Sequence, residues 1–292
     1  MKKVFLTFGD GGENFVAARE RIAREAAATK QFDGIRTCGW DDATEEAKQS
    51  PLRKFKKGAG YWVWKPDLIL AELSKLDDGD ILVWCDAGDV LYPNARQWRR
   101  LFRLMESAEM IVPKIFACGM NWNRKEILER FSGEVPAGCQ MCYQFEANAI
   151  IFRKTPRIVR LVSEWRDIVL NHPECMPFVG GDRTGQLPGF IENRSDQSVL
   201  TMLIYKYVQQ GFPLLRVWDF HFGWNVFGNP AILVARQRGG ATYSWRRSAR
   251  LRRAAERIVW ACQDFLERHG LRICWLHIQT STSGGMIYDG HD

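Results

Sequence analysis

The stretch Ile81–Cys85 limits the fold more than any other part of the sequence. It holds five consecutive apolar residues, and Asp86 follows directly. The run has the length of a strand, and a strand that is apolar on both faces is typical of a parallel sheet covered by helices on both sides. Asp86 is then predicted to lie at the carboxyl end of a buried strand.

The rest of the first 210 residues alternates between strand and helix patterns. Residues 14–28 repeat apolar side chains at helical spacing, with Asn14 as a predicted N-cap, and Pro66 suits the first turn of a helix. Further strands are predicted at 3–8, 32–38, 111–113 and 147–152, and further helices at 96–106, 156–170 and 196–209. This pattern predicts an α/β fold with mixed strand directions.

Composition places the chain among ordinary globular proteins. Its 292 residues are 46% hydrophobic and 26% charged, enough for one large domain or two small ones. The apolar start at Val4–Phe8 is cut short by glycines, so it is interpreted as a strand rather than a signal peptide. No apolar run approaches the ~18 residues that cross a bilayer.

The eight cysteines are scattered. In a long chain without a predicted secretion signal, this favours reduced thiols and a cytoplasmic location. Cys139 and Cys142 have the spacing of a zinc or redox motif, but no second pair lies at a matching distance, so inert thiols are favoured.

The net charge of +7 is concentrated near the carboxyl end. Residues 245–272 hold eight arginines against three acidic residues, which gives +5 in this stretch. The same region has the apolar spacing of an amphipathic helix. A cationic face with Arg252, Arg253, Arg257 and Trp260 predicts docking on an anionic membrane surface or a lipid-linked acceptor.

Candidate site residues follow the central predicted strand. Asp86 and Asp89 lie where open α/β sheets bind ligands, and two carboxylates suit a hard cation that bridges phosphates. The alternative is that both aspartates only form a turn or cap a helix from Pro93. Trp62 and Trp64, some twenty residues earlier, are either a ligand platform or ordinary packing residues.

Three motifs together resemble a mostly bacterial group of GT-A glycosyltransferases. The first is Gly58-Ala59-Gly60-Tyr61-Trp62-Val63-Trp64-Lys65-Pro66, the second is Gly79-Asp80, an apolar strand and then Asp86-Ala87-Gly88, and the third is Glu192-Asn193-Arg194-Ser195-Asp196-Gln197-Ser198. They span roughly residues 4–225 in the order found in that group.

The resemblance implies a GT-A (Rossmann-like) α/β domain over residues 1–240, with a nucleotide-sugar half at about 1–115 and an acceptor half at about 116–240. Residues 241–292 would form the basic amphipathic helix and tail. The implied activity is transfer of a sugar from a nucleoside-diphosphate sugar, expected to be UDP-linked, to a hydroxyl of a glycan or lipid-linked glycan. The enzyme would act in the cytoplasm, or peripherally at the inner face of the membrane.

The resemblance also suggests roles for individual residues. Donor binding is expected from the loop after the first strand, the aromatic motif and two later residues: Phe8, Gly9, Asp10, Tyr61, Trp62, Trp64, Lys65, Asp86 and Arg194. Catalytic carboxylates are expected at Asp196 and Glu192, with a helix N-cap as the alternative role of Asp196.

A divalent cation, Mn²⁺ or Mg²⁺, is the expected cofactor. Its predicted ligands are Asp86, Asp89 and His221, with His277 in reserve. Many GT-A enzymes carry Asp-x-Asp at the metal site, whereas Gly88 stands at the third position here, so Asp86 is the stronger candidate.

Two other functions fit parts of the sequence. Twelve tryptophans and the arginine-rich stretch are compatible with a non-catalytic nucleic-acid-binding protein. The aromatics and arginines lie mostly in different segments, so no nucleic acid is expected as a partner. The third possibility is nucleotidyl transfer on the same fold.

Overall fold

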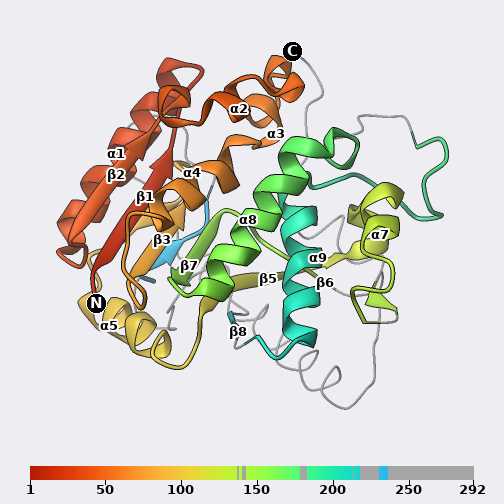
Figure 1. Cartoon of the computed structure of the whole chain (residues 1–292). Coiled ribbons are helices and arrows are strands. Elements are labelled where there is room, and N and C mark those ends of the chain that lie inside the picture. The colour runs from red at the N-terminus through yellow and green to blue at the C-terminus, as the bar shows by residue number, and fades with distance from the viewer. Residues whose placement is uncertain (137, 140–142, 178–182, 213, 218–229, 236–292) are drawn as a thin grey trace, which may run out of the picture.

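A mixed β-sheet forms the centre of the molecule in the computed structural model, which describes all residues except 137, 140–142, 178–182, 213, 218–229 and 236–292 (Figure 1). Within the described residues the sheet has seven strands in the order β2-β1-β3-β7-β5-β6, with β8 paired to β5. The strands are β1 Lys3–Phe8, β2 Gly34–Cys38, β3 Ile81–Cys85, β5 Met110–Cys118, β6 Tyr143–Phe145, β7 Ala149–Arg153 and β8 Leu214–Val217. A smaller pair joins β4 Val90–Leu91 to β9 Ile232–Leu233.

Strand directions change in the middle of the sheet. β2, β1 and β3 are parallel to one another, so their carboxyl ends lie at the same edge. β7 runs antiparallel to both β3 and β5, and β6 runs antiparallel to β5. The prediction of an α/β fold with mixed strand directions is confirmed, and so is the prediction that Ile81–Cys85 is buried throughout.

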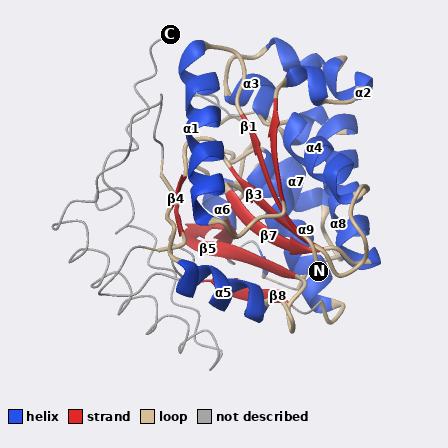
Figure 2. Cartoon of the chain, turned by 90° about the vertical axis from the view of Figure 1, so that its left-hand side faces the viewer, coloured by secondary structure: helices blue, strands red, loops and turns tan. Residues whose placement is uncertain are grey.

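Helices cover both faces of the sheet (Figure 2). The longer helices are α1 Glu13–Thr29, α4 Trp64–Leu73, α5 Ala95–Leu104, α8 Pro156–Asn171 and α9 Asp196–Gln209. Short helical turns are η1 Trp40–Asp42, α2 Glu45–Lys48, η2 Pro51–Lys54, α3 Gly58–Tyr61, α6 Gly119–Trp122, α7 Lys125–Arg130 and η4 Pro173–Cys175.

Alternate side chains of each strand enter different cores, as the pleat requires. Leu82 and Trp84 belong to the core that also contains the buried faces of α4, α8 and α9. Ile81 and Val83 face the opposite core, with side chains of α1 and α5. Each core contains fully buried aromatic side chains, Trp84 and Trp165 in the first and Phe5 and Trp98 in the second. The central strands are therefore shielded from water on both faces.

Two local predictions were wrong at element ends. Asn14 is not an N-cap, because α1 begins at Glu13 and Gly12 occupies the cap position. The helix after β4 begins at Ala95 and is capped by the Asn94 side chain, so the aspartates after β3 do not cap it. Observed bounds also shift elsewhere: β5 extends well beyond the predicted 111–113, and β7 starts two residues after the predicted 147.

An unusual backbone turn precedes α4. All five residues from Gly58 to Trp62 have positive φ, including the non-glycine residues Ala59, Tyr61 and Trp62. Left-handed backbone costs a non-glycine residue roughly 1–2 kcal/mol, so the surrounding packing must hold this turn in place. A Cβ at Gly58 would lie 2.4 Å from the Trp62 ring, which excludes any larger residue there.

Within the described residues, no helix combines the length and the hydrophobicity that crossing a bilayer requires. Five cysteines within the described residues are buried free thiols: Cys38, Cys85, Cys118, Cys139 and Cys175. Cys142, His221, His277 and the predicted basic helix of 241–292 lie outside the described residues.

Candidate active site at the carboxyl ends of the central strands

Lys65 joins two motifs that are far apart in the sequence. Its ammonium nitrogen lies 3.1 Å from Asp86 Oδ1 and 3.3 Å from Asp196 Oδ2. It also donates a hydrogen bond of 3.0 Å to the carbonyl oxygen of Ala147. The ammonium group is thus surrounded by one hydrogen-bonded carbonyl oxygen and two carboxylate oxygens at ion-pair distance.

Burial decides what Lys65 can do. Only 2% of the residue is exposed, and burial by itself lowers the pKa of an amine. Here the neighbouring carboxylates of Asp196 and Asp86 outweigh burial, and the pKa of Lys65 is raised. The side chain is therefore a fixed internal cation that holds the two aspartates together.

Asp86 lies at the carboxyl end of β3, as the sequence predicts. Its backbone N–H donates to the carbonyl oxygen of Asn148, and its Oδ1 accepts a hydrogen bond from the Trp84 indole at 3.2 Å. With 29% of its side chain exposed, Asp86 is the most accessible carboxylate around Lys65.

Asp89 is more deeply placed than Asp86. It is fully buried; its Oδ1 accepts a hydrogen bond from the Ala235 N–H, whereas Oδ2 has no hydrogen-bond partner among the described residues. Burial and the nearby charge of Asp86 raise the pKa of Asp89 well above its usual range. The raised pKa favours the protonated, neutral form of Asp89 when no cation lies beside it.

A buried arginine holds the turn that carries these carboxylates. Arg21 of α1 donates to the carbonyl oxygens of Ala87 and Asp89 at 2.7 and 2.8 Å. It also pairs with Glu25 at 2.7 Å, and Glu25 in turn accepts the N–H of Leu91. Arg21 was not predicted as a site residue, although an arginine and a glutamate four residues apart on a buried helical face are a detectable signal.

Asp196 is the first residue of α9, where a helix start is predicted. It is preceded by Ser195, which occupies the N-cap position, so the alternative role of Asp196 as the N-cap itself is wrong. Burial raises the pKa of Asp196 to about 6; the charge of Lys65 lowers it and that of Asp86 raises it. A carboxylate with this pKa can exchange a proton near neutral pH.

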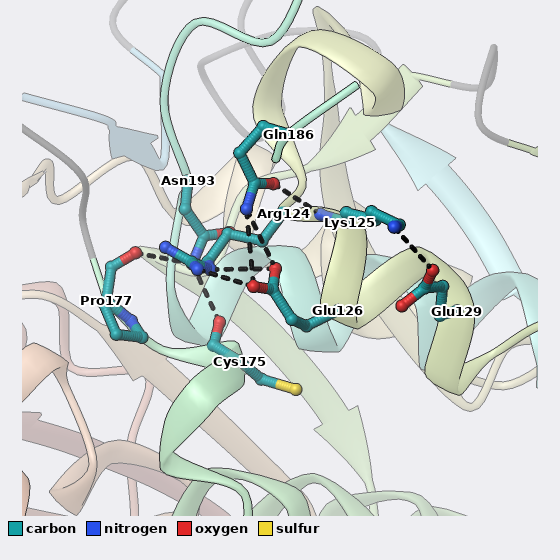
Figure 3. A network of polar contacts seen from close by, with 8 residues as sticks. All are labelled: Arg124, Lys125, Glu126, Glu129, Cys175, Pro177, Gln186 and Asn193. Atoms are coloured by element: carbon teal, nitrogen blue, oxygen red, sulfur yellow. Dashed lines mark hydrogen bonds and ion pairs between the residues drawn. The ribbon is translucent and has the colours of Figure 1, made fainter. Parts of the chain in front are cut away.

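The segment before α9 is anchored by buried polar side chains. Asn193 donates to the carbonyl oxygens of Cys175 and Pro177, beside a cluster in which Glu126 pairs with Arg124 and accepts from Gln186 (Figure 3). These two carbonyls lie in and just after η4, so Asn193 ties the start of α9 to the end of α8.

Ser195 completes this anchor. Its hydroxyl donates to the carbonyl oxygen of Met176, and its φ of 51° is an uncommon left-handed value for a serine. Neither Asn193 nor Ser195 was singled out from the sequence, because their roles depend on contacts with a segment about twenty residues away.

Neither Glu192 nor Arg194 is among the recorded partners of the Lys65 ammonium group. Glu192 is half-buried and is not among the three acceptors of the Lys65 ammonium group. The Arg194 guanidinium lies 4.0 Å from the centre of the Trp122 ring, as a cation on an aromatic face. The structure thus brings Asp196 and Asp86 together, while a catalytic role for Glu192 and donor binding by Arg194 stay predictions.

Aromatic rings line the neighbouring ends of β1 and β2. Phe8 stacks on Trp64 with ring centroids 3.7 Å apart, and its edge contacts Trp40. Asp10 accepts the N–H of Trp40, which joins the turns after the two strands. Gly9 is required there because a Cβ would lie 2.5 Å from the carbonyl oxygen of Phe15.

The aromatic motif differs in exposure along its length. Tyr61 and Trp64 are buried, and only Trp62 is half-exposed. Of the predicted donor-binding aromatics, Trp62 is therefore the best placed to meet a ligand, because Phe8, Tyr61 and Trp64 are buried.

Comparison with known proteins gives structural similarities only. No family model matches the chain, and no curated protein matches it at a significant level. Among solved structures, it is similar to a glycosyltransferase involved in the glycosylation of the major capsid of PBCV-1, with 10% identity and a TM-score of 0.40 over 76% of this chain and 84% of that one. It is also similar to the galactosyltransferase LgtC in complex with donor and acceptor sugar analogs, with 13% identity and a TM-score of 0.34 over 74% and 73% of the two chains.

Replacing Arg21 with Met should destabilise the protein by about 3–5 kcal/mol, because Glu25 and two carbonyl oxygens would lose a buried charged partner. Urea denaturation measures the change. Arg24→Met, an exposed arginine on the same helix, is the control and should stay within about 0.5 kcal/mol of wild type. A change for Arg21→Met as small as that of the control would contradict the anchoring role.

Asp196 should give wild type a pH-dependent stability that Asp196→Asn lacks. Its pKa is raised from 3.8 to about 6 on folding, so the folded state holds the proton more tightly and its stability falls as pH rises from about 4 to about 6. From about pH 4 to about pH 6, the range that these two pKa values define, the unfolding free energy of Asp196→Asn minus that of wild type should therefore increase by at most about 3 kcal/mol. Unfolding free energies measured at several pH values test this, and parallel curves would show that the Asp196 pKa is not raised.

Proposed function

We propose that this protein is a glycosyltransferase that moves a sugar from a nucleoside-diphosphate sugar, most simply a UDP-sugar, to a hydroxyl of a glycan or lipid-linked glycan. The observation that carries the proposal is the buried contact of Lys65 with Asp86 and Asp196. These residues belong to the three motifs that resemble the GT-A group, and they meet at the edge of the sheet where α/β folds bind ligands.

The chemistry of the reaction fits the charges at this edge. The leaving group is a nucleoside diphosphate, and its departure is helped by positive charge near the phosphates. Asp86 and Asp89 supply hard oxygen donors, and the buried Oδ2 of Asp89 has no hydrogen-bond partner among the described residues. These features fit a divalent cation such as Mn²⁺ or Mg²⁺, which would supply the positive charge when bound.

The described residues do not complete a metal site by themselves. They contain no group of three or more histidine, cysteine or acidic side chains arranged to hold an ion. Two protein carboxylates with phosphate oxygens and water are a common arrangement for Mg²⁺ and Mn²⁺. His221, the third predicted ligand, lies outside the described residues and stays a prediction.

Asp196 has the properties of a general base for the acceptor hydroxyl. Its pKa of about 6 keeps it mostly ionised at neutral pH while leaving it basic enough to accept a proton. Lys65 acts as a positioning residue in this proposal rather than as a ligand of the sugar donor, because it is buried and its charge is paired with Asp86 and Asp196. Trp62 would contact the donor from the half-exposed end of the aromatic motif.

Binding of UDP tests the role of Asp86. Wild type should bind UDP more tightly with Mn²⁺ than with EDTA, whereas Asp86→Asn should bind it equally in both, because the amide cannot balance the charge of the cation. Isothermal titration of both proteins measures this. Asp41→Asn, which changes an exposed aspartate, should keep the full effect of Mn²⁺.

Three results would contradict these assignments. Equal Mn²⁺ enhancement in wild type and Asp86→Asn would exclude Asp86 as a ligand. Failure of wild type to bind any nucleoside diphosphate would remove the support for sugar transfer, and release of pyrophosphate instead of UDP would identify nucleotidyl transfer.

Hydrolysis of a donor sugar tests the role of Asp196. With water as acceptor, Asp196→Asn should lower the rate by about 10²–10⁴-fold, since the amide keeps the size of the side chain but cannot accept a proton. In wild type the rate should rise with pH and level off above about 6. Asp78→Asn, an exposed substitution, is the control, and near-normal turnover of Asp196→Asn would rule out the base.

A further inference from the structure

A surface segment beside the aromatic motif combines four cations with one exposed aromatic ring. We call residues 53–57 the basic strap: Arg53, Lys54, Phe55, Lys56 and Lys57. It runs from the last two residues of η2 to the left-handed turn and contains no acidic residue. Arg53, Lys54 and Lys56 are exposed, and Phe55 is one of three large hydrophobic residues reported as exposed in the described part of the chain.

The ring of Phe55 is held in its exposed position. The Phe55 N–H donates to the carbonyl oxygen of Leu52, and its own carbonyl oxygen accepts the N–H of Gly60 at 2.9 Å. Its ring leans on Tyr61, with centroids 5.0 Å apart, and 39% of the residue remains exposed. The exposed face of the ring is therefore presented by a fixed backbone rather than by a loose side chain.

The left-handed turn packs tightly against the first residue of the basic strap. Gly60 has φ of 96°, and a Cβ at this position would lie 3.0 Å from the Cα of Arg53. Only glycine allows the chain to fold back this tightly onto the beginning of the strap. The strained backbone of this turn is held by the surrounding structure. It fixes the position of Phe55 next to the strap cations, because the Gly60 N–H bonds to the carbonyl oxygen of Phe55.

Three of the four strap cations, Arg53, Lys54 and Lys56, lack an ion-pair partner among the described residues. Arg53 lies over the Trp40 ring and donates to a carbonyl oxygen, and Lys54 lies 5.4 Å from the centre of the Phe55 ring. Among the described residues, neither of them nor Lys56 has a carboxylate partner within ion-pair distance. Their charge is thus available to an external anionic partner.

The strap lies at the same end of the molecule as the candidate site. Both views place α2 and α3 beyond the carboxyl end of β1, which runs towards them from the N-terminus (Figures 1 and 2). The contact between Arg53 and Trp40 continues through Phe8 to Trp64. A surface that binds the strap would therefore lie close to the site.

We propose that the basic strap docks the protein on an anionic lipid bilayer, with Phe55 at the level of the headgroups and the cations against anionic lipids. An exposed aromatic ring beside Arg53, Lys54 and Lys56, which have no carboxylate partner among the described residues, fits a partner that is both anionic and apolar, and the bilayer interface is such a partner. A single-stranded nucleic acid fits less well, because its binding sites offer a series of stacking rings and the strap exposes one. The proposal goes beyond sugar transfer and does not depend on it.

Co-sedimentation of the full-length protein with lipid vesicles tests the proposal. Wild type should bind vesicles of phosphatidylcholine mixed with phosphatidylglycerol, bind pure phosphatidylcholine weakly, and lose affinity as salt is raised. Phe55→Ala, and separately Lys54→Gln with Lys56→Gln, should each lower the partition coefficient by about tenfold or more. The double variant changes only exposed side chains, so it remains informative if Phe55→Ala folds poorly.

Matched controls come from α1. Phe15→Ala removes another exposed phenylalanine, 48% exposed, and Arg24→Gln with Lys30→Gln removes two exposed cations. Both should bind vesicles within about twofold of wild type. All variants keep residues 241–292, so a loss confined to the strap variants cannot arise from the arginine-rich stretch.

Three results would overturn the proposal. Equal binding of wild type to neutral and anionic vesicles would exclude the charge contribution. Strap variants that bind anionic vesicles as well as the α1 controls would show that another surface docks. Strap variants that lose affinity for single-stranded RNA but keep affinity for vesicles would make the strap a nucleic-acid surface.

Discussion

The candidate site depends on one buried cation. An unpaired lysine ammonium inside a protein would be strongly destabilised by loss of water, yet Lys65 stays charged because Asp86, Asp196 and a carbonyl oxygen surround it. Its three contacts connect α4, the end of β3, the start of α9 and the loop before β7. Removing any one of these partners would leave a buried charge poorly compensated, so the four segments are fixed together.

The two aspartates around Lys65 differ in environment and therefore in chemistry. Asp86 is partly exposed and can meet a ligand, whereas Asp196 is almost fully buried. Burial raises the pKa of Asp196, and the neighbouring Lys65 keeps it from rising further. Neighbouring carboxylates in different environments are suited to different tasks in one reaction. This difference in environment supports the proposed roles, in which Asp86 binds the cation at the diphosphate and Asp196 accepts the proton of the acceptor hydroxyl.

Local patterns predicted the elements that carry the site, but not the contacts that hold it. The apolar run of β3 and the aspartate after it were identified correctly because a doubly buried strand is recognisable from five residues. The start of α9 at Asp196 was also correct. The anchoring roles of Arg21, Asn193 and Ser195 were not predicted, because each side chain bonds to a segment distant in the sequence. The Asn14 cap failed for a local reason: Gly12 takes the cap position, one residue before the helix begins.

The aromatic motif shows how a single stretch can serve packing and the site at once. Gly58 and Gly60 allow a left-handed turn that most residues would oppose, and the Trp64 indole donates to the carbonyl oxygen of Gly58. This turn leaves Trp62 half-exposed, directs Trp64 against Phe8, and brings Lys65 into the interior as α4 begins. Pairing between residues 65 and 196 then requires the turn, because a regular right-handed helix through residues 58–62 would rotate every following side chain. The glycines of the motif are therefore explained by the position of the lysine, without any need for them to touch a ligand.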